Sequence, residues 1–108
     1  MNLYSCFFQT FYRLKIGTYH GDIDDAMTYG NNMPFTTKDV DNDNHGSNCA
    51  QIYQGAWWYH SCYHCNLNGL NYGYAKRDGT GIRWNVVVGD NGSGKDSLKS
   101  ITMAIRPQ

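Results

Sequence analysis

The chain contains no glutamate, and all nine of its acidic residues are aspartate. Aspartate competes with the helical backbone for hydrogen bonds and is therefore weak in helix interiors. Twelve glycines and many asparagines add residues that tolerate the positive φ angles of turns and loops. Aromatic residues make up 15% of the chain, and most are Tyr or Trp. This composition predicts a loop-rich domain with some strand and little helix, as is typical of extracellular recognition modules.

Length and charge narrow the class of protein further. The 108 residues suffice for one small domain with one modest core. Nine basic residues balance nine acidic ones, so the net charge is zero, which argues against nucleic acid and against a polybasic grip on a membrane. No apolar run approaches the ~20 residues of a membrane span. We therefore expect neither nucleic acid nor membrane as a partner.

Hydrophobic periodicity predicts three strands. Apolar and polar residues alternate over residues 12–16 and 100–106, and these two half-buried strands could pair as antiparallel neighbours. The nearly continuous apolar run over residues 82–88 predicts a third, more buried strand. Residues 21–27 indicate a turn with one helical turn, and residues 29–50 are predicted to form a loop.

Three aspartates stand at alternate positions: Asp39, Asp41 and Asp43. Alternate carboxylates in a tight loop can converge on a calcium ion, which prefers oxygen ligands. An EF-hand does not fit, because its glycine position holds Asn44 and its glutamate position holds Ala50. A solvated Asx-rich turn is one alternative. A catalytic carboxylate pair is another, and it would need one buried carboxylate with a raised pKa.

Four cysteines allow three full pairings. The HSCYHC segment, residues 60–65, could supply zinc ligands, but a structural zinc site usually takes two ligand pairs separated by a longer loop. A redox motif at Cys62 and Cys65 lacks its βαβ context. We favour a structural disulfide from Cys49 to Cys62, whose loop gives roughly 3 kcal/mol in the chain-entropy model.

Two motifs overlap in residues 89–97, GDNGSGKDS. The segment nearly fits a phosphate-binding loop, but Asp96 occupies the Ser/Thr position and would repel phosphate. We therefore predict a Gly-rich hairpin loop there. Asn91 begins an N-glycosylation acceptor, which matters only in a secreted chain. The N-terminal residues lack the features of a signal peptide.

Aromatic residues gather in the second half of the chain. Rings that pack on apolar faces, with hydroxyls and indole N–H groups fixing orientation, can line a sugar or acetyl pocket. The alternative is that Trp57 and Trp58 are core and that the tyrosines are half-buried surface. No nucleophile, base and orienting group form a set, so we do not expect an enzyme. The aromatic group is Tyr53, Trp57, Trp58, Tyr59, Tyr63, Tyr72 and Tyr74.

Four sequence blocks carry a resemblance to a known family: DVDND at 39–43, NCA at 48–50, GAWWY at 55–59 and NLNG at 66–69. Residues 12–108 resemble the C-terminal half of a fibrinogen-like domain, as found in ficolin- and tachylectin-type lectins, while residues 1–11 remain unassigned. The resemblance implies a truncated domain of the α+β class. Its small antiparallel sheet and short helices would carry long calcium-binding and pocket loops.

The resemblance implies a calcium ion as cofactor. Its side-chain ligands would be Asp41 and Asp43, and the carbonyl oxygens of His45 and Ser47 would complete the shell with water molecules. Asp39 corresponds to a family aspartate that precedes the site.

The resemblance also implies a disulfide between Cys49 and Cys62 and a ligand pocket beside the calcium loop. In the family lectins the peptide that enters the second cysteine, here Ser61-Cys62, is cis. The pocket tyrosine in the 70s could be Tyr72 or Tyr74, and we choose Tyr74. The expected ligand-binding residues are Tyr53, Ser61, Cys62, Tyr63, His64 and Tyr74.

The chain departs from the lectin pattern at several positions. Tyr63 stands where the lectins have His, and Val87 and Asp90 replace an expected aromatic wall. Two functions are therefore weighed. The first is a secreted, calcium-binding, lectin-like module of innate defence that binds acetylated glycans. The alternative is a non-lectin protein-interaction module of the fibrinogen or tenascin type. An exposed strand edge, and Cys6 without a family counterpart, would also suit a homo-oligomer.

Overall fold

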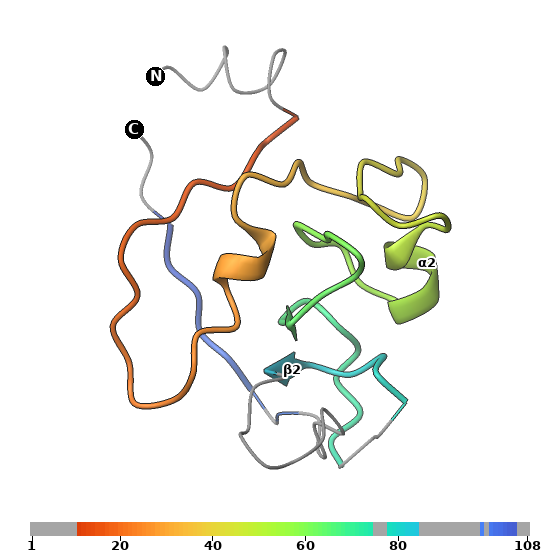
Figure 1. The fold of residues 1–108 in the computed structure, drawn as a ribbon. Helices are drawn as coiled ribbons and strands as arrows, with labels where there is room; N and C mark the ends of the chain where they lie inside the picture. Colours follow the sequence, from red (N-terminus) through yellow and green to blue (C-terminus); the bar gives the residue numbers. More distant parts are fainter. Residues whose placement is uncertain (1–10, 75–77, 85–97, 99, 106–108) are drawn as a thin grey trace.

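The computed structural model describes residues 11–74, 78–84, 98 and 100–105, and most of these residues lie in loops (Figure 1). Their helices and strands are short: η1 (Thr28–Gly30, a 3-10 helix), α2 (Cys49–Tyr53), β1 (Cys65–Asn66) and β2 (Arg83–Trp84). The predicted loop-rich domain with short helices and a small antiparallel sheet is confirmed. None of the helices in the described ranges has the length and apolar character needed to cross a membrane.

The sheet consists of β1 and β2, which pair antiparallel with Cys65 opposite Trp84 and Asn66 opposite Arg83. Strand β2 lies within the predicted strand over residues 82–88, of which the last four lie outside the described residues. The predicted hairpin loop over residues 89–97 also lies outside them.

The predicted pairing of residues 12–16 with residues 100–106 is wrong for the described part of the chain. Neither segment is a strand there, and residue 106 lies outside the described residues. Instead, Leu14 N donates to the Met33 carbonyl (3.0 Å) and Asn32 N donates to the Leu14 carbonyl (2.9 Å). The backbone of Leu14 is therefore hydrogen-bonded to residues 32 and 33, which are nearer in sequence, and not to residues 100–106.

Helix α2 was not predicted, because its first two residues fall in the predicted loop over residues 29–50 and no element was predicted for residues 51–53. Asn48 begins the helix, since its side-chain oxygen accepts hydrogen bonds from Ala50 N (2.8 Å) and Gln51 N (3.4 Å). Gln54 ends it in the left-handed conformation, with φ of 60°. From the sequence, a capping asparagine in an Asn-rich loop looks like any other turn residue.

The 3-10 helix η1 begins one residue after the predicted helical turn over residues 21–27. Asp25 organises its start, because its carboxylate accepts hydrogen bonds from Met27 N (2.9 Å) and Thr28 N (3.1 Å). The Thr28 hydroxyl also donates to this carboxylate, and this bond is the main reason that the pKa of Asp25 is lowered. Aspartate therefore acts here as a local turn former, as the composition predicts.

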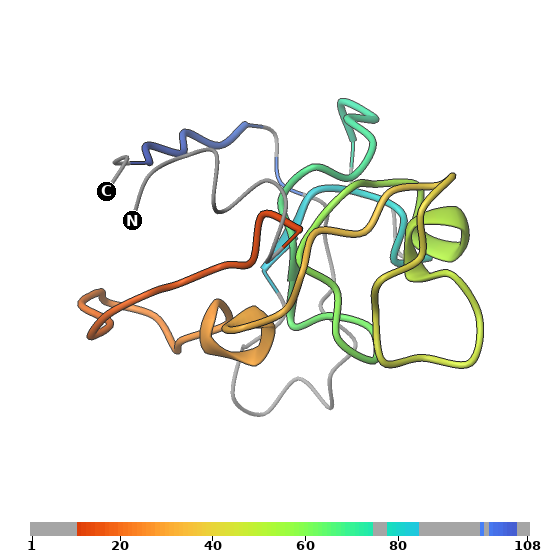
Figure 2. The same ribbon diagram turned by 90° about the horizontal axis from the view of Figure 1, so that it is seen from above.

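The core lies between α2, the two strands and the chain that precedes the second disulfide cysteine. Trp57 belongs to it with 2% of its surface exposed, whereas Trp58 is half-buried and packs against it. Figures 1 and 2 show α2 and the loop before it at one end of the molecule, opposite the segment 11–25. The buried cluster consists of Ala26, Cys49, Ala50, Trp57, Tyr59, Cys65, Leu67 and Ile82.

Candidate functional site

The Asp-rich loop folds back on its own backbone through its carboxylates. Asp43 N donates to Asp41 Oδ1 (3.1 Å), and His45 N donates to Asp43 Oδ1 (2.9 Å). The second carboxylate oxygen of Asp43 accepts from Cys49 N (2.8 Å), the first residue of α2. Each carboxylate oxygen has two acceptor positions, so these bonds still leave lone pairs for a cation.

The pKa values of Asp43 and Asp39 are shifted in opposite directions. Burial raises the pKa of Asp43, two backbone hydrogen bonds oppose that rise, and the adjacent Asp41 carboxylate raises it again. Asp39 lies outside this pair, because the Thr37 hydroxyl donates to it (2.7 Å) and lowers its pKa. A cation near Asp41 and Asp43 would offset both the burial of one carboxylate and the repulsion between the two.

The sequence also predicts carbonyl ligands from His45 and Ser47. Ser47 N lies 3.1 Å from His45 Nδ1, and the Ser47 carbonyl oxygen lies 3.2 Å from the same nitrogen. A backbone N–H can only donate, so Nδ1 acts as an acceptor and carries no proton. The ring therefore cannot donate to the Ser47 carbonyl, which stays free of that bond. Carboxylate and carbonyl oxygens are the types of donor that a hard cation such as calcium prefers.

The described cysteines and histidines do not make a zinc site in the HSCYHC segment. A ring nitrogen of His45 and the sulfurs of Cys49 and Cys62 lie within 4.8 Å of one another. However, Cys49 and Cys62 form a disulfide, with sulfurs 2.04 Å apart, and zinc needs thiolates. Cys65 is a free thiol buried in the core. The zinc alternative is therefore wrong here, and so is a redox pair of Cys62 with Cys65.

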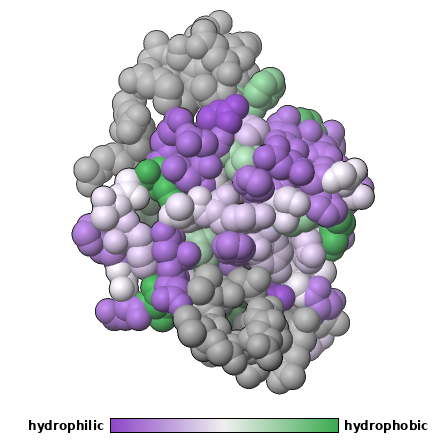
Figure 3. Space-filling view, viewed as in Figure 1, coloured by the Kyte–Doolittle hydropathy of each residue, from purple (hydrophilic) through white to green (hydrophobic). Residues whose placement is uncertain are grey.

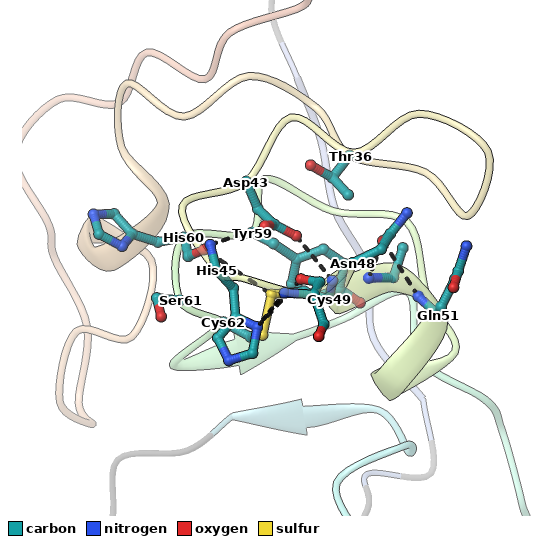
Figure 4. The surroundings of a disulfide bond; sticks show 12 residues. Thr36, Asp43, His45, Asn48, Cys49, Gln51, Tyr59, His60, Ser61 and Cys62 are labelled. Atoms are coloured by element: carbon teal, nitrogen blue, oxygen red, sulfur yellow. Dashed lines mark hydrogen bonds between the residues drawn. A yellow bond between two sulfur atoms is a disulfide. The ribbon is translucent and has the colours of Figure 1, made fainter.

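The disulfide joins the Asp-rich loop and α2 to the segment that carries the expected pocket peptide (Figure 4). The Ser61–Cys62 peptide bond is cis. His60 N donates to the Cys62 carbonyl (2.7 Å), and Asn44 N donates to the His60 carbonyl (2.9 Å). The candidate calcium loop is thus hydrogen-bonded directly to the segment 60–62. A shift of the backbone in one of them would therefore displace the other.

Two of the predicted pocket residues contact each other. The rings of Tyr53 and Tyr63 meet edge to face with centroids 4.9 Å apart, and the Tyr63 hydroxyl donates to the Gly79 carbonyl (2.6 Å). Burial raises the pKa of Tyr63, an effect that the nearby Arg83 guanidinium partly opposes, so this hydroxyl keeps its proton at neutral pH. Two residues expected to hold a ligand thus pack on each other, and the Tyr63 hydroxyl is bonded to the backbone of the protein itself.

His64 contacts Tyr29, which the sequence does not suggest as a site residue. The two rings are stacked, with centroids 3.9 Å apart and planes 10° apart. Tyr29 also lies 4.8 Å from the His60 ring, and its hydroxyl donates to the Ser61 carbonyl (3.2 Å). Because Tyr29 and Ser61 are 32 residues apart in sequence, no motif signals this contact. The remaining predicted residue, Tyr74, is 61% exposed.

Asn66 is a second residue that sequence reasoning missed. It is fully buried, accepts a hydrogen bond from the Tyr59 hydroxyl (2.6 Å), and donates to the carbonyls of Tyr53 and Gly81 (both 3.3 Å). It therefore ties the end of α2 and the chain before β2 to the aromatic core. Only its place in the NLNG block could have drawn attention to it.

These features define a class of protein: a small, loop-rich domain with short helices and one small sheet, closed by a disulfide. A family model described as the C-terminal globular domain of fibrinogen beta and gamma chains matches residues 6–108. The chain belongs to this fibrinogen C-terminal domain family, which confirms the resemblance. Family membership also confirms that the domain is not an enzyme.

Individual relatives agree with this family. The chain is 43% identical to human angiopoietin-related protein 6 over 99 residues, which are 89% of this chain and 20% of that protein. It is 49% identical to tenascin-R of Gallus gallus over 76 residues, which are 70% of this chain and 6% of that protein. The solved fibrinogen-like globe domain of human ANGPTL6 matches with a TM-score of 0.68 and 39% identity, over 83% of this chain and 40% of that one. The chain thus spans a minor part of each relative.

Proposed function

We propose that this chain is an extracellular, calcium-binding module that recognises protein ligands. Its relatives include an angiopoietin-related protein and a tenascin, which supports the protein-interaction alternative over the acetyl-binding lectin. Homologues are secreted, and a disulfide between Cys49 and Cys62 suits the same oxidising location.

The hydrogen bond from the Tyr63 hydroxyl to the Gly79 carbonyl carries this proposal. An acetyl group in the expected pocket would have to break this bond, which is part-buried, and part the rings of Tyr53 and Tyr63. Leaving a buried polar group without a partner costs about 1–3 kcal/mol, which a small acetyl contact must first recover. A protein ligand can bind the outer surface without this cost.

The outer surface beside the disulfide offers suitable contacts. Tyr29 is half-buried, and both His64 and Ser61 are exposed, so an aromatic stack lies next to exposed backbone. Figure 3 shows one face of the molecule, on which the described surface is mostly hydrophilic, with hydrophobic residues scattered over it. A polar surface with a few aromatic anchors is typical of non-obligate protein interfaces.

Calcium would have an organising role in this proposal. Asp41 and Asp43 would bind it through carboxylates, and His45 and Ser47 through carbonyl oxygens. Its charge would offset the repulsion between the two carboxylates and hold the loop in one conformation. Because Asn44 bonds to His60, that ordering would extend to the segment 60–62.

Binding to cultured cells tests the choice between protein and sugar. We expect flow cytometry to show binding that trypsin treatment of the cells removes, and that neither glycosidase treatment nor N-acetylglucosamine reduces. His64→Ala should weaken binding by about fivefold, since the exposed His64 ring would contact the ligand and a lost contact of about 1 kcal/mol corresponds to that factor. The control is His20→Ala, at an exposed histidine elsewhere on the molecule. Competition by acetylated sugar would restore the lectin reading and overturn this proposal.

Calcium binding is tested separately by thermal unfolding. A site of the extracellular class, saturated at about 5 mM calcium, should stabilise the chain by about 1.4 kcal/mol, and magnesium should not replace it. Asp43→Asn should abolish this stabilisation. Asp39→Asn is the matched control, because Asp39 bonds to Thr37 outside the ligand set. Equal responses of the two variants to calcium would refute the assigned ligands.

A further inference from the structure

A cavity of about 330 Å³ lies between the two arms of the loop that leads into η1. The outgoing arm contributes residues 16–20 to its lining, and the returning arm contributes Asp25 and Met27. Figures 1 and 2 show this loop, residues 16–25, projecting from the body of the molecule and returning to η1. The volume is within the range of ligand pockets in proteins. None of the lining residues belongs to the candidate calcium loop or to the expected acetyl pocket.

Contacts within the loop and with β2 hold the walls of this cavity in place. The Tyr19 hydroxyl donates to the Ile23 carbonyl (2.7 Å), which closes the loop near its tip. The Trp84 ring stacks on Tyr19 with centroids 6.4 Å apart, and the Trp84 indole N–H donates to the Asp24 carbonyl (2.8 Å). Trp84 therefore anchors both arms of the loop, and the cavity is formed before any ligand enters it.

The returning arm gives the cavity a negative charge. The hydrogen bond from the Thr28 hydroxyl is the main reason that the pKa of Asp25 is lowered, so its carboxylate is ionised at neutral pH. Among the described residues, no lysine or arginine pairs with this carboxylate. The cations nearest to it in sequence, Arg13 and Lys15, both donate to Asn32. The charge of the cavity is therefore complementary to a cation from outside the described chain.

The acceptor positions of Asp25 favour an ammonium over a guanidinium. Its Oδ1 accepts from both Met27 N (2.9 Å) and Thr28 N (3.1 Å), and its Oδ2 accepts from the Thr28 hydroxyl. Each carboxylate oxygen has about two acceptor positions, so one position is left, on Oδ2. An arginine fork forms two parallel bonds to a carboxylate, whereas a lysine ammonium can use a single acceptor. Ile16 and Met27 would pack on the methylene stem of a lysine, and the Tyr19 ring would attract its charge.

We propose that this cavity binds a lysine side chain of the protein ligand. The assignment of the lysine to a protein rests on the proposed function, whereas the cavity itself can be tested without it. The ammonium would donate to Oδ2 of Asp25, with its stem between the two arms of the loop. A basic segment that carries this lysine would also meet the exposed Asp22 and Asp24, which precede Asp25 in the loop.

NMR titration of the ¹⁵N-labelled full chain with a capped lysine, N-acetyl-lysine methylamide, tests this site. We expect saturable shifts of the Trp84 indole N–H, because its ring stacks on Tyr19, and of the amides of residues 16–20 and 25–27. The indole signal of the buried Trp57 should stay unchanged. Capped norleucine, which has the stem without the ammonium, should bind about tenfold more weakly, and capped arginine about threefold more weakly.

Asp25→Asn keeps a carbonyl oxygen for the N–H groups of Met27 and Thr28 but removes the charge, and it should weaken the binding of capped lysine about tenfold. Asp24→Asn is the matched control, because it removes the same charge one residue away, outside the lining, and should weaken binding less than about twofold. His20→Ala should keep binding, since His20 is exposed and is assigned no contact with the lysine.

The proposal is overturned if capped norleucine binds as tightly as capped lysine, if capped arginine binds more tightly, or if the two aspartate variants behave alike. The comparison of capped ligands needs no variant, so it decides even if Asp25→Asn does not fold. Binding of capped lysine by a chain that binds no protein on cells would refute the proposed function while supporting this site.

Discussion

Asn66→Ala should destabilise the domain more than any surface substitution, because Asn66 is a buried hydrogen-bonding hub. Its side chain is fully buried and makes three hydrogen bonds. The shortest is the 2.6 Å bond from the Tyr59 hydroxyl, whose own residue is also fully buried. Burial is the main reason that the pKa of Tyr59 is raised, so this hydroxyl stays protonated and always needs an acceptor.

The expected cost follows from what the substitution leaves behind. The Tyr59 hydroxyl loses its acceptor, a penalty of about 1–3 kcal/mol. The carbonyls of Tyr53 and Gly81 lose weaker bonds of 3.3 Å, and a small cavity opens, which together add about 1–2 kcal/mol. We therefore expect a loss of roughly 2–5 kcal/mol, a large share of the ~5–15 kcal/mol that stabilises a small domain.

Urea unfolding followed by tryptophan fluorescence measures this loss. Asn68→Ala is the control, because Asn68 makes one exposed hydrogen bond, to the Ala56 carbonyl (2.9 Å), and should cost less than about 1 kcal/mol. Tyr59→Phe alone should be milder than Asn66→Ala, and the double variant should cost about 1–2 kcal/mol less than the sum. The reasoning is refuted if Asn66→Ala costs no more than Asn68→Ala, or if the two core substitutions are additive.

Three further predictions concern pH, capping and the closed tyrosine pair. Burial raises the pKa of the Cys65 thiol from 9.0 to about 12, so its contribution to stability is complete below pH 9 and declines as pH rises to 12. Between pH 8 and pH 10 the unchanged chain should therefore lose about 1.4 kcal/mol that Cys65→Ala does not lose, and equal losses in urea titrations would contradict this. Asn48→Ala should cost about 1–2 kcal/mol in the same assay, because it removes the cap of α2, whereas Gln51→Ala, on the exposed face, should cost less. Gly79→Ala should destabilise by about 1–3 kcal/mol, since φ is +88° and the new Cβ would lie 2.9 Å from the Tyr53 ring; an unchanged unfolding midpoint would show that this pair can open.

Parts of the site were predictable because their signals are local. Alternate aspartates between turn residues indicate a tight acidic loop, and the structure places Asp41 and Asp43 together while Asp39 bonds to Thr37. The pairing of Cys49 with Cys62 also depends on a short sequence separation of 13. Helix α2 escaped prediction for the opposite reason, since five residues are too few to show a helical period.

The sequence by itself determined the local structure of this domain: little helix, many Asx and Gly turns, a short disulfide loop and an acidic loop beside it. These properties depend on each residue's own backbone preferences and on neighbours a few positions away. The tertiary structure alone decided which side chains meet, such as His64 with Tyr29, or Tyr63 with Gly79. Those contacts join distant residues whose faces are set by packing, so the same tyrosine could line an open pocket or close it.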